Sequence, residues 1–354
     1  MKLLNLIKND PWLEPYSNVI ERRYQQATDK EKDLLRGAET LSDFATGYLY
    51  FGLHKSSDGW VIREWAPNAT EIYLIGTFSE WKEKAIYRFK KLKNGIWEIK
   101  LKSNEIKHLD LYKLSMHWNG GQGERIPAWA TRVVQDEKSY IFSAQVWNPE
   151  KKYIFKKKKF TPKISPLLIY ECHIGMAQEE ERVGTYDEFR RNVLPRIAAD
   201  GYNAIQIMAI QEHPYYGSFG YHVSSFFAPS SRFGTPEDLK HLIDDAHNLG
   251  IAVIMDIVHS HAVKNEVEGL GRFDGSYDQF FYGDHRREHP AWDSLCFDYG
   301  KNEVIHFLLS NCKYWLEEFK FDGFRFDGVT SMLYYNHGLG KAFCNYNDYY
   351  DGGQ

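Results

Sequence analysis

Short apolar runs separated by polar and turn residues fill the chain from about residue 47 to residue 146. Clear examples are WVIREW (60–65), EIYLI (71–75) and IWEIKL (96–101), with Gly, Asn, Ser and Pro between the runs. Such runs are typical of short β-strands, and their close spacing predicts a β-sandwich. We expect the sandwich to span residues 47–150, after a helical segment over residues 1–46.

The pattern changes after Pro166, where strands alternate with helices. We predict strands at 167–170, 203–209, 251–258 and 321–327, and helices over 185–201, 235–250 and 303–319. Strand–helix–strand units form a parallel sheet, either doubly wound or closed as a (β/α)8 barrel. No GxGxxG follows the first strand, which argues against a dinucleotide-binding sheet.

Local signals mark the N-terminal ends of the first two helices after Pro166. Thr185 and Glu188 have the spacing of a capping box, and Thr235 precedes Pro236 at the first position of the next helix. Pro195 lies inside the first helix and is expected to bend it, because proline cannot donate a backbone hydrogen bond.

Composition narrows the function classes. The 44 Lys and Arg residues nearly balance the 48 Asp and Glu residues, so we expect no nucleic-acid partner. No apolar run approaches the ~20 residues of a membrane span, and the N-terminus does not resemble a secretory signal, so we expect a cytoplasmic protein without membrane contact. Aromatic residues reach 16%; their flat faces also fill protein cores, so this excess alone only weakly favours carbohydrate or nucleic-acid contact.

Polar residues stand where two of the predicted parallel strands end. Asp256 closes the third strand and leads into His259-Ser260-His261, while Arg325 and Asp327 close the fourth. Catalytic residues of parallel barrels project from this end of the sheet. Arg325 and Asp327 share a face of their strand, whereas Phe324 and Phe326 point the other way and are expected to pack under the outer helices.

A carboxyl group beside a guanidinium stays ionised and can act as a nucleophile. Two other interpretations remain open from the residues alone. Arg325 and Asp327 could form a purely structural ion pair, and Asp256 with His259 and His261 could hold a metal ion in a hydrolase.

Three stretches together resemble one known family. The stretches are FGY (219–221), DIVHSH (256–261) and GFRFDGV (323–329). They resemble the alpha-amylase superfamily, glycoside hydrolase family 13. The longer runs YGSFGYHVSSFFAPSSRFGTPEDLK (216–240) and DGFRFDGVTSMLYYNHG (322–338) resemble the eukaryotic-type 1,4-alpha-glucan branching enzymes, and the second argues against a debranching relative.

The sandwich is similar to the family 48 carbohydrate-binding modules, on the motifs EWAP (64–67) and GTFSEW (76–81). That resemblance implies a glucan-stacking role for Trp81, although a tryptophan of the sandwich core would fit the sequence equally well. The fold implied for the whole chain is multidomain: the sandwich, a linker over residues 151–166, and strands 1–4 of an incomplete (β/α)8 barrel over residues 167–354.

The resemblance also implies roles in the barrel. Asp327 matches the catalytic nucleophile and Arg325 the arginine that keeps it ionised, while Tyr221, Asp256 and His261 match residues that bind the reacting sugar. The implied reaction transfers a segment of an α-1,4-glucan such as glycogen, amylose or starch to a 6-hydroxyl group by a retaining double displacement. It needs no cofactor. Ser260 replaces an asparagine calcium ligand of some amylases, so the resemblance implies no metal.

The sequence departs from the family pattern after residue 354. The family carries a glutamate general acid at the fifth strand, a His-Asp pair at the seventh and a C-terminal β-domain, none of which has a match here. We therefore predict a fragment that does not branch glucan alone. A non-catalytic glucan-binding polypeptide is the alternative.

Overall fold

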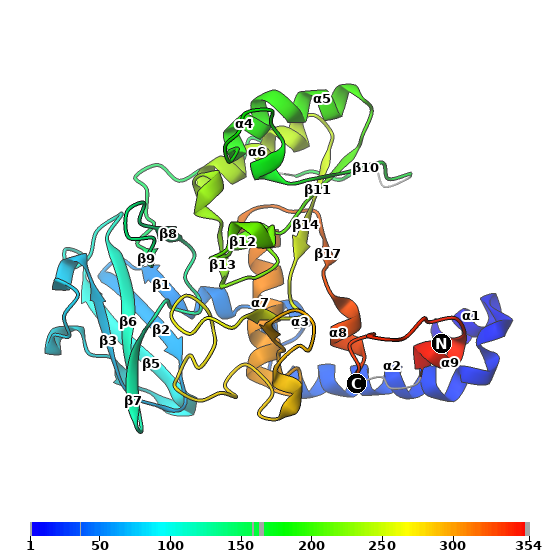
Figure 1. Ribbon diagram of the computed structural model, residues 1–354, viewed down its shortest axis with the longest axis horizontal. Coiled ribbons are helices and arrows are strands. Elements are labelled where there is room, and N and C mark those ends of the chain that lie inside the picture. The colour runs from blue at the N-terminus through cyan, green and yellow to red at the C-terminus, as the bar shows by residue number, and fades with distance from the viewer. Residues whose placement is uncertain (1, 36, 158, 163–165, 351–354) are drawn as a thin grey trace. The chain divides into compact units, whose positions relative to one another are not determined.

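The computed structural model, shown in Figure 1, describes residues 2–35, 37–157, 159–162 and 166–350. The chain divides into two compact units, residues 1–46 with residues 329–354, and residues 47–328. The strands of the sandwich and of the parallel sheet all belong to the second unit.

The first unit is helical. Its elements are α1 (Lys2–Asn9), the 3-10 helix η1 (Pro11–Tyr16), α2 (Ser17–Leu34), α3 (Leu41–Phe44), α8 (Val329–Leu333) and α9 (Tyr346–Tyr350). Tyr16 joins its two stretches of chain, because its hydroxyl donates to Oδ1 of Asn347 at 3.1 Å and its ring centroid lies 5.6 Å from that of Tyr346. The helices predicted for the N-terminal segment are present.

Two antiparallel sheets form the sandwich. One contains β1 (Gly52–Lys55), β2 (Gly59–Trp65), β5 (Ile96–Lys102) and β4 (Lys90–Lys91), in that order. The other contains β3 (Ala69–Gly76), β6 (Leu111–Trp118), β9 (Phe142–Gln145) and β8 (Val133–Gln135), with β7 (Gly121–Arg125) also paired to β6. Alternate side chains, such as Trp60 and Ile62, are buried between the sheets.

Glu64 is a charged residue type in this otherwise apolar core. Its side chain is fully buried, and its two carboxyl oxygens accept hydrogen bonds from the backbone N–H groups of Trp65 (3.2 Å) and Ala128 (3.0 Å). Burial raises the pKa of Glu64 to about 8, although these hydrogen bonds oppose the rise. The carboxyl group therefore fixes the loop around Ala128 to β2.

Four parallel strands form the barrel sheet, in the order β10 (Ile169–Cys172), β11 (Ala204–Ile207), β14 (Ala252–Ile257) and β17 (Gly323–Phe326). They match the four predicted strands. Shorter pairs lie beyond their ends: β12 (Gln211–Glu212) with β13 (Ser225–Pro229), and β15 (Ala262–Val263) with β16 (Ser294–Leu295). The fold class predicted from the sequence is thus present.

Helices follow the strands of the barrel sheet. They are α4 (Tyr186–Glu188), the π-helix η7 (Phe189–Val193), α5 (Leu194–Ala199), α6 (Pro236–Asn248) and α7 (Asn302–Glu318). Thr185 with Glu188, and Thr235 with Asp238, form capping boxes. Pro195 interrupts the first predicted helix as expected, and the interruption takes the form of a π-helical turn just before it.

Short 3-10 helices occur in the connections of the second unit. They are η2 (Gly47–Leu49), η3 (Thr77–Ser79), η4 (Ala85–Tyr87), η5 (Lys93–Gly95), η6 (Ile174–Met176), η8 (Tyr216–Ser218), η9 (Ser231–Phe233) and η10 (His285–Arg287).

The outer strands of the barrel sheet carry exposed apolar side chains. Within the described residues, β10 pairs only with β11 and β17 only with β14. Ile169 and Tyr170 on β10 are exposed, and so is Phe326 on β17. The prediction that Phe326 packs under the outer helices is therefore wrong, because Phe326 ends the last strand of the described sheet and stays exposed, whereas Phe324 on the same face is half-buried against the core.

The predicted linker is attached to α6. Asp244 of that helix accepts hydrogen bonds from the Tyr153 hydroxyl (2.6 Å) and from the backbone N–H groups of Lys156 (2.8 Å) and Lys157 (3.1 Å). Lys158 lies outside the described residues. The described part of this segment is thus bound to the barrel, and the bounds of the four predicted segments remain predictions.

Candidate active site and glucan-binding pocket

The carboxyl ends of β14 and β17 bring the predicted charged residues together. Asp256 and Arg325 are direct partners in the register of the two parallel strands. Asp327 follows β17 immediately, and its backbone N–H donates to the carbonyl of Ile257 at 3.0 Å, which continues the pairing. The strand register therefore sets the spacing of all three side chains.

Arg325 lies between the two carboxylates. Its Nη1 donates to Oδ1 and Oδ2 of Asp256 at 2.9 and 3.0 Å, and to Oδ1 of Asp327 at 2.7 Å. The Asp256 side chain is fully buried, whereas that of Asp327 is 20% exposed. Burial alone would lower the pKa of Arg325, but the two carboxylates raise it, so the guanidinium keeps its charge.

Tyr221 and His261 complete the group around Asp256. The Tyr221 hydroxyl donates to Oδ2 of Asp256 at 2.9 Å, and Nε2 of His261 donates to the backbone carbonyl of Tyr221 at 2.9 Å. Burial raises the pKa of Tyr221, and the charge of Asp256 adds to the rise. Burial lowers the pKa of His261, so the ring is neutral and its Nδ1 accepts from the Ser260 hydroxyl at 2.9 Å.

Asp256 and Asp327 differ in what surrounds them. Burial raises the pKa of Asp256, while its hydrogen bonds from Arg325 and Tyr221 oppose the rise. Both of its oxygens are occupied by these donors. Asp327 uses only Oδ1, and its Oδ2 has no hydrogen-bond partner among the described residues. Asp327 is therefore the carboxylate that can reach a substrate atom.

The metal-ion alternative has no support in this geometry. His259 directs Nε2 to Oδ1 of Asn311 at 2.9 Å, and burial lowers its pKa to about 4. His261 and Asp256 are engaged with Tyr221 and Arg325 instead. Across the part of the chain that the structure describes, no three His, Cys, Asp or Glu side chains are grouped so that they could hold a metal ion.

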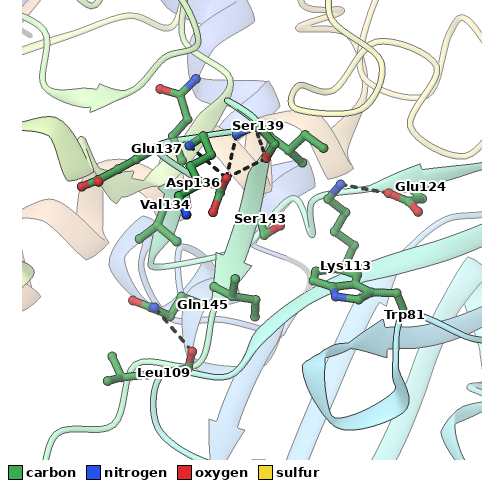
Figure 2. A pocket seen from close by; sticks show the side chains of 14 residues that line it. Trp81, Leu109, Lys113, Glu124, Val134, Asp136, Glu137, Ser139, Ser143 and Gln145 are labelled. Carbon is green, nitrogen blue, oxygen red and sulfur yellow. Dashed lines mark hydrogen bonds and ion pairs between the residues drawn. The ribbon is translucent and has the colours of Figure 1, made fainter.

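Trp81 lies in the sandwich, at the rim of a pocket of 840 Å³ (Figure 2). Its side chain is 39% exposed, so it is not a core residue. Glu80 and Trp81 both have φ of 59°, in the left-handed region that non-glycine residues rarely occupy, and the Trp81 N–H donates to the Gly76 carbonyl at 2.9 Å. A strained turn thus presents the indole to the pocket.

Lys113 is a pocket residue that the sequence analysis missed. Its ammonium lies 5.8 Å from the Trp81 ring centroid and donates to Glu124 Oε2 at 2.9 Å, as Figure 2 shows. The turn around Asp136 and Ser139 forms the opposite wall, and Oδ1 of Asp136 accepts from the Ser139 N–H at 2.7 Å. The signal available in the sequence was a lysine flanked by Tyr112 and Leu114.

A second residue that the sequence analysis did not single out is Trp292. Its ring centroid lies 5.2 Å from that of His261, so it borders the active site. It lies in the irregular connection between η10 and β16, which gave the sequence no periodic pattern to detect.

Two family models match the chain. The model for Carbohydrate-binding module 48 (Isoamylase N-terminal domain) matches residues 50–130, and the model for Alpha amylase, catalytic domain, matches residues 194–294. The first range covers most of the sandwich, and the second covers β11 and β14 with Tyr221, Asp256 and His261, but ends before Arg325 and Asp327.

Proteins of known activity align with almost the whole chain. A 1,4-alpha-glucan-branching enzyme of Yarrowia lipolytica is 49% identical over 98% of this chain and 51% of its own length. An Arabidopsis thaliana relative named "1,4-alpha-glucan-branching enzyme 2-2, chloroplastic/amyloplastic" is 47% identical over 96% of this chain and 43% of its own length. The chain spans about half the length of the curated relatives it matches.

A solved structure shares the fold. The GBS pullulanase SAP, determined in complex with maltotetraose, superposes with a TM-score of 0.64 at 19% identity, over 81% of this chain and 44% of that chain. Among the described residues, no helix is both long and apolar enough to cross a bilayer.

Proposed function

Because the chain is a homologue of the 1,4-alpha-glucan-branching enzymes and spans about half their length, we propose that it supplies the nucleophile and the donor-sugar site of a branching reaction. The bridge from Arg325 to Asp256 and Asp327, at the carboxyl ends of parallel strands, carries this proposal. The substrate we propose is an α-1,4-glucan such as glycogen, amylose or starch.

Asp327 acts as the nucleophile in this proposal. Its free oxygen attacks the anomeric carbon of a glucan residue, the bond to the leaving 4-oxygen breaks, and a covalent glycosyl ester forms. Arg325 fixes the other oxygen at 2.7 Å and its charge stabilises the carboxylate. The 6-hydroxyl of another glucan chain then displaces Asp327 and receives the segment.

Asp256, Tyr221 and His261 bind the sugar that Asp327 attacks. Tyr221 is held by its hydroxyl to Asp256 and by its carbonyl to His261, so its ring has a fixed orientation for stacking on a sugar. The neutral His261 uses both ring nitrogens, for the Tyr221 carbonyl and the Ser260 hydroxyl, so in this proposal it acts by orienting Tyr221.

A retaining displacement also needs a second carboxyl group about 5–5.5 Å from the nucleophile, to protonate the leaving oxygen. Asp256 is the neighbouring carboxylate in the described structure, and both of its oxygens are bonded to Arg325 and Tyr221. We therefore propose that the 354-residue polypeptide binds glucan and carries the nucleophile but does not branch natural glucan alone.

A sugar fluoride tests the nucleophile independently of the missing acid. Fluoride leaves without protonation, so α-maltotriosyl fluoride reports on the nucleophile alone: Asp327 forms the new C–O bond, the C–F bond breaks, and water later hydrolyses the ester. We expect fluoride release by the chain and none above buffer by Asp327→Asn. Equal release by both proteins would contradict the role of Asp327.

Natural glucan gives the complementary measurement. We expect no new α-1,6 linkages when the chain is incubated with amylose, measured by iodine staining and by chain lengths after debranching. New branches would show that the acid lies within these 354 residues.

The pocket at Trp81 supports a second function, glucan attachment without catalysis. An exposed indole with Lys113 beside it offers a flat apolar face and a hydrogen-bond donor to a sugar chain. Co-sedimentation with glycogen, with and without Trp81→Ala, tests this function separately from fluoride release.

We also propose a cytoplasmic location. The four cysteines are free thiols, as expected in a reducing compartment. Imaging of the tagged protein would decide between the cytoplasm and a plastid like that in the name of the Arabidopsis relative.

A further inference from the structure

A stacked pair of rings borders the active site. The ring centroids of His289 and Trp292 are 3.9 Å apart, and the two planes differ by only 5°. His289 is buried, and its Nδ1 accepts hydrogen bonds from the backbone N–H groups of Ala291 and Trp292, both at 3.1 Å. The histidine therefore fixes both the backbone and the ring plane of Trp292.

Trp292 reaches the residues that surround Asp327. Its ring centroid lies 5.2 Å from that of His261. A Cβ atom placed on Gly328, the residue directly after Asp327, would lie 2.9 Å from Cζ3 of Trp292 and 2.6 Å from Oγ of Ser260. Gly328 also has φ of +62°, so only glycine leaves the indole in this place without strain.

The loop that carries Trp292 is anchored on both sides. The backbone N–H of His289 donates to the Ser294 carbonyl at 2.9 Å, and Ser294 pairs with Val263 in the β15–β16 ladder. Lys264 forms ion pairs with Glu288 at 2.9 Å and with Asp293 at 2.8 Å. The indole is thus held in place before any ligand arrives, which lowers the entropic cost of binding.

Trp292 remains only half-buried although one face is covered by His289. A large apolar ring left open beside carboxylates and a neutral histidine suits a ligand that is both hydroxylated and flat, and sugar rings combine these properties. Simple packing of the loop would not require an open indole.

We propose that Trp292 is a sugar-stacking residue that binds the glucose unit next to the one attacked by Asp327, and that His289 is the positioning residue for its ring. This inference rests on the proposed function, because it assumes that an α-1,4-glucan occupies the site. It adds to the site a specificity for a chain of sugars over a single glucose.

The test measures maltoheptaose affinity by calorimetry in the Trp81→Ala chain, which removes the stacking residue of the sandwich pocket. We expect Trp292→Leu to weaken binding about tenfold and Trp292→Phe to stay within about threefold, since phenylalanine keeps a flat face. Trp12→Ala, at a residue 77% exposed in the helical unit, is the matched control and should change nothing.

His289 has its own prediction. His289→Asn keeps an acceptor for the two N–H groups but loses the ring, so we expect it to weaken maltoheptaose binding less than Trp292→Leu does. If it weakens glucose and maltoheptaose binding equally, His289 does not act through Trp292.

The outcomes distinguish a failure of this inference from a failure of the proposed function. Unchanged maltoheptaose affinity in Trp292→Leu would overturn the inference and leave the proposed function standing. Equal losses in the Leu and Phe variants would also overturn it, because they would indicate packing rather than stacking. No maltoheptaose binding by the Trp81→Ala parent, together with no fluoride release, would overturn the proposed function and this inference with it.

Discussion

The sandwich pocket and the barrel site differ in how their residues are brought together. The sandwich pocket is lined by strands and turns of one antiparallel sheet, which belongs to a core buried between two sheets. The barrel site lies at the ends of β14 and β17, and β17 is an outer strand that, among the described strands, pairs only with β14. A glucan-binding pocket can thus be formed by the strands and turns of a single sheet. The displacement reaction instead needs catalytic residues from the ends of several barrel strands.

Replacing Asp327 should have the largest effect of these changes, and the effect should be confined to the barrel site. We expect Asp327→Asn to lower fluoride release from α-maltotriosyl fluoride at least about 100-fold, because the amide cannot form the glycosyl ester. Glycogen co-sedimentation should be unaffected. Asp58→Asn, at an exposed carboxylate of the sandwich, is the control. Loss of co-sedimentation in Asp327→Asn would mean that the two regions are not independent.

Glu64 should make the stability of the sandwich depend on pH. Its pKa is about 8 when folded, above its ordinary value of 4.5, so the folded state binds the proton more tightly. The free energy of unfolding is therefore highest below about pH 4.5 and falls by a few kcal/mol as the pH rises to about 8.

Urea denaturation from pH 5 to pH 9 measures this change, and Glu64→Gln is the matched variant. The glutamine cannot ionise, so the difference in slope between the two proteins isolates Glu64. Parallel stability curves would show that the buried carboxyl does not titrate in this range.

Trp81→Ala is the converse test, because it changes the sandwich pocket and leaves the barrel site intact. We expect about a tenfold loss of glycogen affinity, because the variant loses one aromatic contact face. Fluoride release should stay at the level of the unmodified chain. A loss of fluoride release would indicate that the sandwich pocket contributes to the reaction itself.

The smallest expected effect concerns the scaffold of the barrel. Thr235→Ala removes the side-chain acceptor at the N-terminus of α6, and we expect a loss of about 1 kcal/mol in the free energy of unfolding. Thr235→Ser keeps the acceptor and should lose little. Equal losses in both variants would assign the effect to the methyl group rather than to the cap.

Local patterns allowed much of the fold to be predicted from the sequence. The four parallel strands and the Thr185 capping box depend on residues close together in the chain, and both are present. Alternation along β17 placed Arg325 and Asp327 on one face, and in the structure Arg325 donates hydrogen bonds to both Asp256 and Asp327. The roles of these residues remain proposals.

Features that depend on distant neighbours could not be predicted. The exposure of Phe326 depends on which elements flank β17, and the attachment of Lys156 to Asp244 depends on where α6 lies. Trp292 and His289 meet in a loop without periodicity. Trp81 fitted a core or a pocket equally well until its exposure was known.

The left-handed backbone at Glu80 and Trp81 has a consequence for engineering. A glycine at position 80 would relieve about 1 kcal/mol of torsional strain, so selection for heat resistance alone would favour it. The same change would loosen the turn that aims the indole. Laboratory evolution of this module should therefore be screened on polysaccharide retention as well as on melting temperature.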